Sequence, residues 1–193
     1  MSKLNKEIKK LKKDIKKFLN TRTITFVLIL IVVSLIWFKY VAGIILLVIF
    51  LPITFITIRY SKMVPHVAIE SNTAMTYFIG YTFGPVAALI YGPLVGISCY
   101  ALNSFISLGY MTTPIIAGVT GALVAILKNA FGFSFAQAFF ISLVVRTLIA
   151  FPWFMMFYDP IEVFSHQISQ FFSNLIIYLP LLSALYGVIA PFV

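Results

Sequence analysis

The fold is decided by one stretch, Gly80-Tyr-Thr-Phe-Gly84-Pro85-Val-Ala-Ala88-Leu-Ile-Tyr-Gly92-Pro93-Leu-Val-Gly96. Its small residues recur at every fourth position and so leave one helix face without bulk. In a bilayer such a face lets helix backbones approach closely, because helix association there depends on packing rather than on the release of water. Each of the two Gly-Pro pairs predicts a break, because proline removes a backbone donor and disfavours helix in the residue before it. The stretch therefore predicts tightly packed membrane helices with Gly-Pro breaks.

The same small-residue spacing recurs further along the chain, in the segment that begins near Thr113. Because residues four apart lie on one helix face, the whole set is expected to lie at close helix crossings. The predicted helix-packing residues are Gly80, Gly84, Ala88, Gly92, Gly96, Ala117 and Gly121.

The composition excludes an ordinary soluble domain. Hydrophobic residues make up 62% of the 193 residues and charged residues only 10%, whereas soluble proteins average near 25% charged. A membrane span needs about 20 residues, so that the chain has room for about five to seven spans. We expect an all-α integral membrane protein of the cell (cytoplasmic) membrane. It would be a compact bundle of six transmembrane helices, or seven if residues 23–37 also cross.

Apolar runs and the breaks between them set the predicted spans. A polar connection over 59–72 separates 41–58 from 73–83, and a polar turn over 158–162 separates 135–157 from 168–190. The core of the bundle is expected at about 41–190, within a transmembrane domain of residues 23–193. The predicted segments are 23–37, 41–58, 73–83, 85–108, 113–127, 135–157 and 168–190.

Positive charge is concentrated in residues 1–22. This segment holds eight lysines and Arg22 against two acidic residues, a net of +7, while the other 171 residues carry +2. Apolar residues at steps of three and four predict a basic amphipathic helix. Such a helix lies on an anionic membrane surface or pairs with a partner helix through its apolar seam. The positive-inside rule favours a cytoplasmic N-terminus, and nothing aromatic or glycine-rich supports nucleic-acid binding.

The sequence carries no enzyme motif. Its two histidines are 100 positions apart, and with one cysteine and five carboxylates they give no metal-ligand spacing. Neither a nucleophile motif nor a phosphate-binding glycine loop occurs. We therefore expect no catalytic activity, no bound metal and no cofactor in this chain, and ATP would be used only by a partner ATPase.

Two stretches resemble a known family. One is 69–94, with Gly80-Tyr-Thr-Phe-Gly-Pro85 at its centre, and the other is Thr113-Pro-Ile-Ile-Ala-Gly118. Both are similar to the core of S components, the substrate-binding membrane subunits of energy-coupling-factor (ECF) vitamin transporters. The resemblance implies a six-helix unit that binds a vitamin-like solute or metal ion and docks on a transmembrane coupling subunit with two ATPases. A similar pattern occurs in membrane scaffold proteins of the MreD kind, which implies the alternative of a cell-shape or assembly protein without transport activity.

Charged residues within the apolar chain are candidates for solute binding. Arg146 lies in an apolar helix, where a charge is costly and must face protein or a wet cavity. It either clamps an anionic solute or forms a structural pair with Glu70, Asp159 or helix carbonyls. Glu70, together with Asn72 and Thr73, either caps the following helix or contacts the solute.

Further candidates are polar or aromatic. Asn103 is expected in the interior, where it binds solute or forms an interhelical hydrogen bond. Tyr77, Tyr81, Tyr100 and Trp153 either stack on a flat heterocycle or pack within the bundle. The candidate substrate-binding residues are thus Arg146, Glu70, Asn72, Tyr77, Tyr81, Tyr100, Asn103 and Trp153.

Overall fold

The computed structural model describes residues 25–29, 38–64 and 67–192. Chain contacts divide the protein into two units, Met1–Val41 and Ala42–Val193. The predicted basic helix over residues 1–22 lies outside the described residues. Of the predicted segment 23–37, residues 25–29 are described, and they are helical with exposed side chains.

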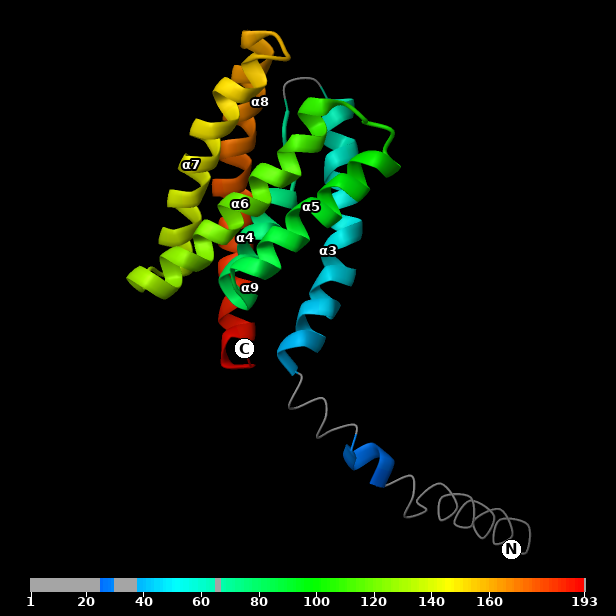
Figure 1. Ribbon diagram of the computed structural model, residues 1–193, viewed down its shortest axis with the longest axis vertical. Coiled ribbons are helices and arrows are strands. Elements are labelled where there is room, and N and C mark those ends of the chain that lie inside the picture. The colour runs from blue at the N-terminus through cyan, green and yellow to red at the C-terminus, as the bar shows by residue number, and fades with distance from the viewer. Residues whose placement is uncertain (1–24, 30–37, 65–66, 193) are drawn as a thin grey trace, which may run out of the picture. The chain divides into compact units, whose positions relative to one another are not determined.

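The described part of the second unit consists of helices (Figure 1). Stretches long and apolar enough to cross a membrane lie at Val41–Met63, Pro85–Leu102, Leu108–Phe131, Phe135–Met155 and Pro160–Ile189. The predicted all-α membrane bundle is confirmed. The elements are α3 (Phe38–Met63), α4 (Asn72–Phe83), α5 (Pro85–Leu102), α6 (Leu108–Phe131), α7 (Phe135–Met155), α8 (Pro160–Ser173), a π-helix (Asn174–Tyr178), α9 (Leu179–Ile189) and a 3₁₀ turn (Ala190–Phe192).

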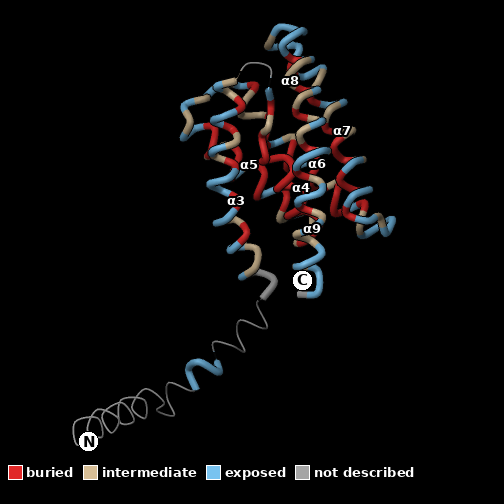
Figure 2. Tube along the Cα trace, turned by 180° about the vertical axis from the view of Figure 1, so that it is seen from behind, coloured by how far each residue is buried: buried red, intermediate tan, exposed pale blue. Residues whose placement is uncertain are grey.

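Helix α4 forms the centre of the bundle. All of its residues from Asn72 to Thr82 are buried, and Figure 2 shows it enclosed by the other helices. Its 12 residues span about 18 Å at 1.5 Å per residue, less than the 30 Å or so of a hydrocarbon core. It is therefore not among the five described stretches that are long enough to cross a membrane, and its neighbours rather than lipid surround it.

The outer helices present apolar side chains outward. Ile44 and Val48 on α3 are each 64% exposed, and Leu148 on α7 is 68% exposed. In water such surfaces would be an aggregation liability, whereas in a bilayer they contact lipid. The chain is a multi-pass membrane protein.

The two Gly-Pro pairs behave differently. Gly84 has φ +103°, ψ 175°, a conformation that favours glycine, and it ends α4 before Pro85 begins α5. The predicted break at Gly92-Pro93 is wrong, because α5 continues through it. Pro93 packs instead against α6, since a Cβ on Gly118 would lie 2.9 Å from Pro93 Cδ. Neighbouring helices allow a membrane helix to retain a proline in this way.

The small residues lie where α4, α5 and α6 cross. A Cβ on Gly92 would lie 2.9 Å from the backbone of Gly118, and one on Gly80 would overlap the backbone of Gly121. Gly96 lies against Pro114, while Ala88 and Ala117 are fully buried. Gly84 is the exception and corrects the predicted packing set, because a Cβ there would meet nothing within 4 Å. It serves the turn rather than a helix crossing.

Capping side chains set the helix ends. Helix α6 begins at Leu108, five residues before the predicted start, because the Ser107 side chain accepts a hydrogen bond from Tyr110 N. Ser134 and Gln137 form a capping box that starts α7. The last helical stretch begins at Pro160 rather than at residue 168, because Asp159 accepts hydrogen bonds from the first turn of α8.

Candidate functional site

A segment outside the helices, Val67–Ser71, leads into α4. Several of its backbone groups form hydrogen bonds to side chains of the surrounding helices, which satisfies groups that no helix pairs. Each of these bonds fixes the path of the segment. They join Ala68 N to Ser169 Oγ at 2.9 Å, Ile69 N to Ser61 Oγ at 2.7 Å, Ser71 N to Thr57 Oγ1 at 3.2 Å and the Tyr178 hydroxyl to Ile69 O at 2.5 Å.

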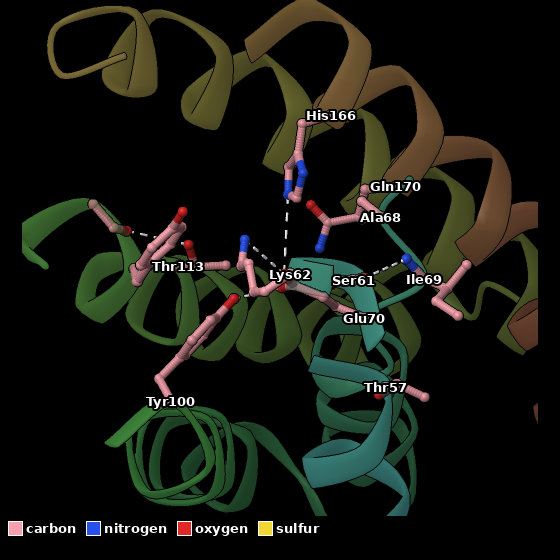
Figure 3. Close-up of polar contacts among 12 residues, drawn as sticks. Thr57, Ser61, Lys62, Ala68, Ile69, Glu70, Tyr100, Thr113, His166 and Gln170 are labelled. Carbon is pink, nitrogen blue, oxygen red and sulfur yellow. Dashed lines mark hydrogen bonds and ion pairs between the residues drawn. The ribbon is translucent and has the colours of Figure 1, made fainter. Parts of the chain in front are cut away.

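This segment holds Glu70 inside the protein, where its side chain is 1% exposed. Lys62 Nζ, from the last turn of α3, lies 3.2 Å from Glu70 Oε1, and the Tyr100 hydroxyl of α5 donates to Glu70 Oε2 over 2.5 Å. His166 Nε2 of α8 lies 4.0 Å from Oε1. Figure 3 shows the three side chains approaching Glu70 from different helices.

The predicted capping role of Glu70 is wrong. Ser71 is the N-cap residue of α4, and it makes no side-chain capping hydrogen bond. Glu70 is turned away to its ion pair with Lys62, because a buried carboxylate without a cation would be far more costly than an uncapped helix end. Glu70 therefore ties α3 to α5.

The surroundings of Glu70 keep it ionised. Burial alone raises the pKa of the Glu70 carboxyl, but the Lys62 ammonium, His166 and the Tyr100 hydroxyl lower it by more. The net pKa lies below the ordinary glutamate value. Glu70 therefore carries its charge near neutral pH, and Lys62 neutralises it.

Beside this cluster lies a half-open cleft of about 50 Å³. It is found at the end of the bundle where α3 and α7 end and α6 and α8 begin (Figure 1). Its wall combines hydroxyl, amide and ammonium groups with a few apolar side chains. The lining residues are Lys62, Tyr110, Thr113, Phe154, Tyr158, Glu162, Val163, His166, Gln167 and Gln170.

Arg146 lies directly behind this wall. Its side chain is 1% exposed, and its guanidinium donates to Gln167 Oε1 at 3.2 Å and to Gln170 Oε1 at 2.8 Å. The predicted structural pair with Glu70, Asp159 or helix carbonyls is wrong. Both glutamines reach Arg146 because residues three apart lie on one helix face, here the face of α8 that meets α7.

The other sequence-predicted residues lie away from the cleft or behind it. Tyr77 donates to Thr120 and to Ser142 O, and Tyr81 donates to Phe133 O. Their hydroxyls are thus used within the bundle. Tyr100 and Glu70 contact the cleft residue Lys62 but do not line the cleft themselves.

The remaining three candidates also have partners elsewhere. Asn72 Nδ2 donates to Gly92 O at 3.4 Å, and Asn103 Nδ2 donates to Cys99 O at 2.9 Å at the end of α5. Trp153 Nε1 donates to Thr112 Oγ1 at 3.0 Å and is 37% exposed. None of the eight predicted binding residues is among the residues that line the cleft.

Sequence reasoning missed Gln167, Gln170 and Lys62. A signal was present, because two amides three residues apart in an apolar helix share one face and need buried partners. A buried arginine needs acceptors that a nearby glutamine can supply. The sequence does not reveal that α7 and α8 pack together and so bring Arg146 to the two glutamines.

Comparison with known protein families, with curated proteins and with solved structures finds no match to this chain. Within the described ranges, no group of three histidine, cysteine or acidic residues is placed to hold a metal ion. The cleft presents hydrogen-bond donors and acceptors, one carboxylate, one imidazole and aromatic rings.

Proposed function

We propose that this chain is the solute-binding subunit of an ECF-type transporter that takes up a vitamin-like small molecule across the cell membrane. The solute binds in the cleft beside Glu70. A transmembrane coupling subunit and partner ATPases supply the transport energy, and the basic residues 1–22 lie in the cytoplasm. The family resemblance of residues 69–94 and the all-α helical bundle support the proposal.

The polar cleft in an otherwise apolar bundle is the observation that carries this proposal. Charged groups within a membrane protein are costly, and their default interpretation is a functional site. Here Lys62, Glu70 and Arg146 gather around one cleft.

The size of the cleft indicates how a solute is held. About 50 Å³ accommodates roughly three to five non-hydrogen atoms, at 10–15 Å³ for each water-sized group. The polar head of the solute fits inside, and the rest lies at the mouth. There the rings of Tyr110 and Tyr158 stack with centroids 5.8 Å apart, a suitable surface for a flat heterocycle.

Uptake requires the cleft to open to the outside of the cell, and this sets the orientation of the bundle in the membrane. Lys62 lies in the last turn of α3, so that α3 runs toward the cleft. If the basic N-terminus is cytoplasmic and the cleft faces outside, residues 23–37 do not cross the membrane. The proposal therefore favours six passes rather than seven.

Labelling of Glu162→Cys tests the orientation. Glu162 is exposed and lines the cleft, while the single native cysteine, Cys99, is buried and gives little background. A membrane-impermeant maleimide should label this variant on intact cells. Labelling only after lysis would place the cleft in the cytoplasm and rule out an uptake subunit.

Native mass spectrometry of the gently purified protein tests solute binding. A bound small molecule and co-purifying coupling and ATPase subunits are expected. Thr113→Leu fills the cleft and should remove the small molecule, whereas Thr147→Leu, at a half-buried site that does not line the cleft, should retain it. An empty protein that retains a cell-shape partner would replace this proposal with the MreD-like scaffold.

A further inference from the structure

Two glutamines of α8 and the arginine of α7 form a fixed hydrogen-bonded group. Arg146 donates to Gln167 Oε1 and to Gln170 Oε1 at 3.2 and 2.8 Å. All three residues are at most 2% exposed. Gln167 and Gln170 line the cleft, while Arg146 does not. The arginine therefore reaches the cleft only through the two amides.

This contact decides which way each amide points. A guanidinium can only donate hydrogen bonds, so that the amide oxygens of Gln167 and Gln170 must face Arg146. Their NH₂ groups are then directed away from the arginine. Gln170 Nε2 is buried and has no hydrogen-bond partner within the described residues. Figure 3 shows the Gln170 side chain directed from α8 toward His166 and Lys62, which also line the cleft.

A buried donor without an acceptor is costly, because its lost contact with water is not replaced. Such a group in a native protein calls for a partner, and here the cleft is the space in front of it. A ligand that brings a hydrogen-bond acceptor would satisfy it. A ligand that brings only donors would leave it unpaired.

The charges around the cleft favour a negative acceptor. Glu70 is already neutralised by Lys62 at 3.2 Å. Over the part of the chain that the structure describes, no carboxylate lies within 4 Å of Arg146, and its Nε is also without a hydrogen-bond partner. The buried charge of Arg146 therefore has no direct counter-ion next to the cleft, and a buried charge of this kind is stabilised by an ion of opposite sign.

We propose that the inner end of the cleft is a carboxylate subsite, in which the Gln170 and Gln167 amide NH₂ groups bind the ligand and Arg146 fixes their orientation. The inference rests on the proposed function in that it names the substrate class of the same cleft. Two NH₂ donors from residues three apart on one helix face match the two oxygens of a planar carboxylate. Glu162, exposed at the cleft, disfavours a second negative group, so the solute is a monocarboxylate. Arg146 is a positioning residue.

The test uses acetate and acetamide, which share size and shape but differ in charge and in the second acceptor. Saturation-transfer NMR with the full chain in detergent micelles measures binding of each. Acetate should bind at least ten times more tightly than acetamide. Equal binding of the two probes would overturn the carboxylate subsite.

Gln170→Glu removes the donor without removing the contact to Arg146. The new carboxylate takes the place of Gln170 Oε1 and forms an ion pair with the guanidinium, so the variant should melt at or above the wild-type temperature. Acetate binding should fall at least ten-fold. Gln137→Glu is the matched control, because it adds the same charge at an exposed capping position and keeps the capping box. Acetate binding to Gln170→Glu at the wild-type level would refute the assignment.

Arg146→Lys tests the positioning role. Lysine keeps the positive charge but replaces the planar fork with a single rotatable ammonium, which holds the two amides less rigidly. The preference for acetate over acetamide should therefore drop, and unchanged selectivity would contradict the role. If a neutral solute co-purifies and is lost in Thr113→Leu while acetate does not bind, the proposed function stands and this inference fails. If no solute is found, acetate does not bind and Glu162→Cys is labelled only after lysis, both fail.

Discussion

The crossing of α5 and α6 at Gly92 makes the sharpest prediction about stability. In Gly92→Ala the added Cβ would lie 2.9 Å from the backbone N and Cα of Gly118 and 3.0 Å from Thr76 Cγ2. Carbon atoms prefer separations of about 3.5–4.0 Å, so the helices must move apart by about 0.5–1 Å. A radial gap of that size forfeits a quarter to a half of each nearby dispersion contact. Overpacking of this kind costs about 1–3 kcal/mol.

The buried cysteine provides the assay. Cys99 is the single cysteine of the chain and is fully buried, so that a fluorogenic maleimide reports unfolding as the detergent-solubilised protein is heated. A cost of about 2 kcal/mol lowers the melting temperature by about 4 to 8 °C. All variants must be heated at the same rate, because unfolding of this kind is often irreversible.

Gly187→Ala is the matched control for Gly92→Ala. Gly187 lies in α9, and a Cβ there would meet nothing within 4 Å. Alanine at an open helix position is favoured over glycine by about 0.5–1 kcal/mol, so this variant should melt at or slightly above the wild-type temperature. If Gly92→Ala were as stable as Gly187→Ala, the close crossing of α5 and α6 would be refuted.

Two further substitutions test the segment between α3 and α4. Lys62→Met leaves Glu70 buried without its cation and should cost about 3–5 kcal/mol at pH 7. Because the folded pKa of Glu70 is below the ordinary glutamate value of 4.5, the ion pair stabilises the fold above that pH, and this stabilisation is lost as the pH falls below it. The difference in melting temperature between Lys62→Met and wild type should therefore narrow from pH 7 to pH 4, and a constant difference would count against the ion pair. Tyr178→Phe removes the hydrogen bond to a carbonyl of the 67–71 segment and should cost about 1–3 kcal/mol. Tyr60→Phe, at a side chain that is 51% exposed, should change stability by less than about 0.5 kcal/mol, and equal effects in the two variants would contradict the buried contact.

Part of the candidate site was readable from the sequence. Arg146 stands out because a charge in an apolar helix must face protein or water. Its partners do not stand out, because Gln167 and Gln170 belong to the next helix and a glutamine has many possible roles. Glu70 was assigned to the nearest helix end, while Lys62 and His166, which approach it in space, lie eight and 96 positions away. Contacts at such separations follow from the arrangement of helices, which residue spacing within one segment does not reveal.

Some helix ends follow from neighbouring residues in the sequence, whereas others depend on tertiary contacts. The starts of α5 at Pro85 and of α7 at Phe135 coincide with the predicted ones, because proline and a capping serine act on neighbouring residues. Gly92-Pro93 carried the same local signal as Gly84-Pro85 but lies within α5. There Pro93 packs against Gly118, and tertiary contact outweighs the local preference for a break.

The sequence by itself determined that this chain is an all-α membrane bundle and that α4, α5 and α6 pack closely. Those features depend on the proportion of apolar residues and on spacing along single helices, both of which are local quantities. Only the tertiary structure decided which polar residues form the cleft and that Arg146 contacts two glutamines rather than a carboxylate. The reason is that burial makes polar groups find partners wherever the fold places them, and the fold joins residues that are far apart in the chain.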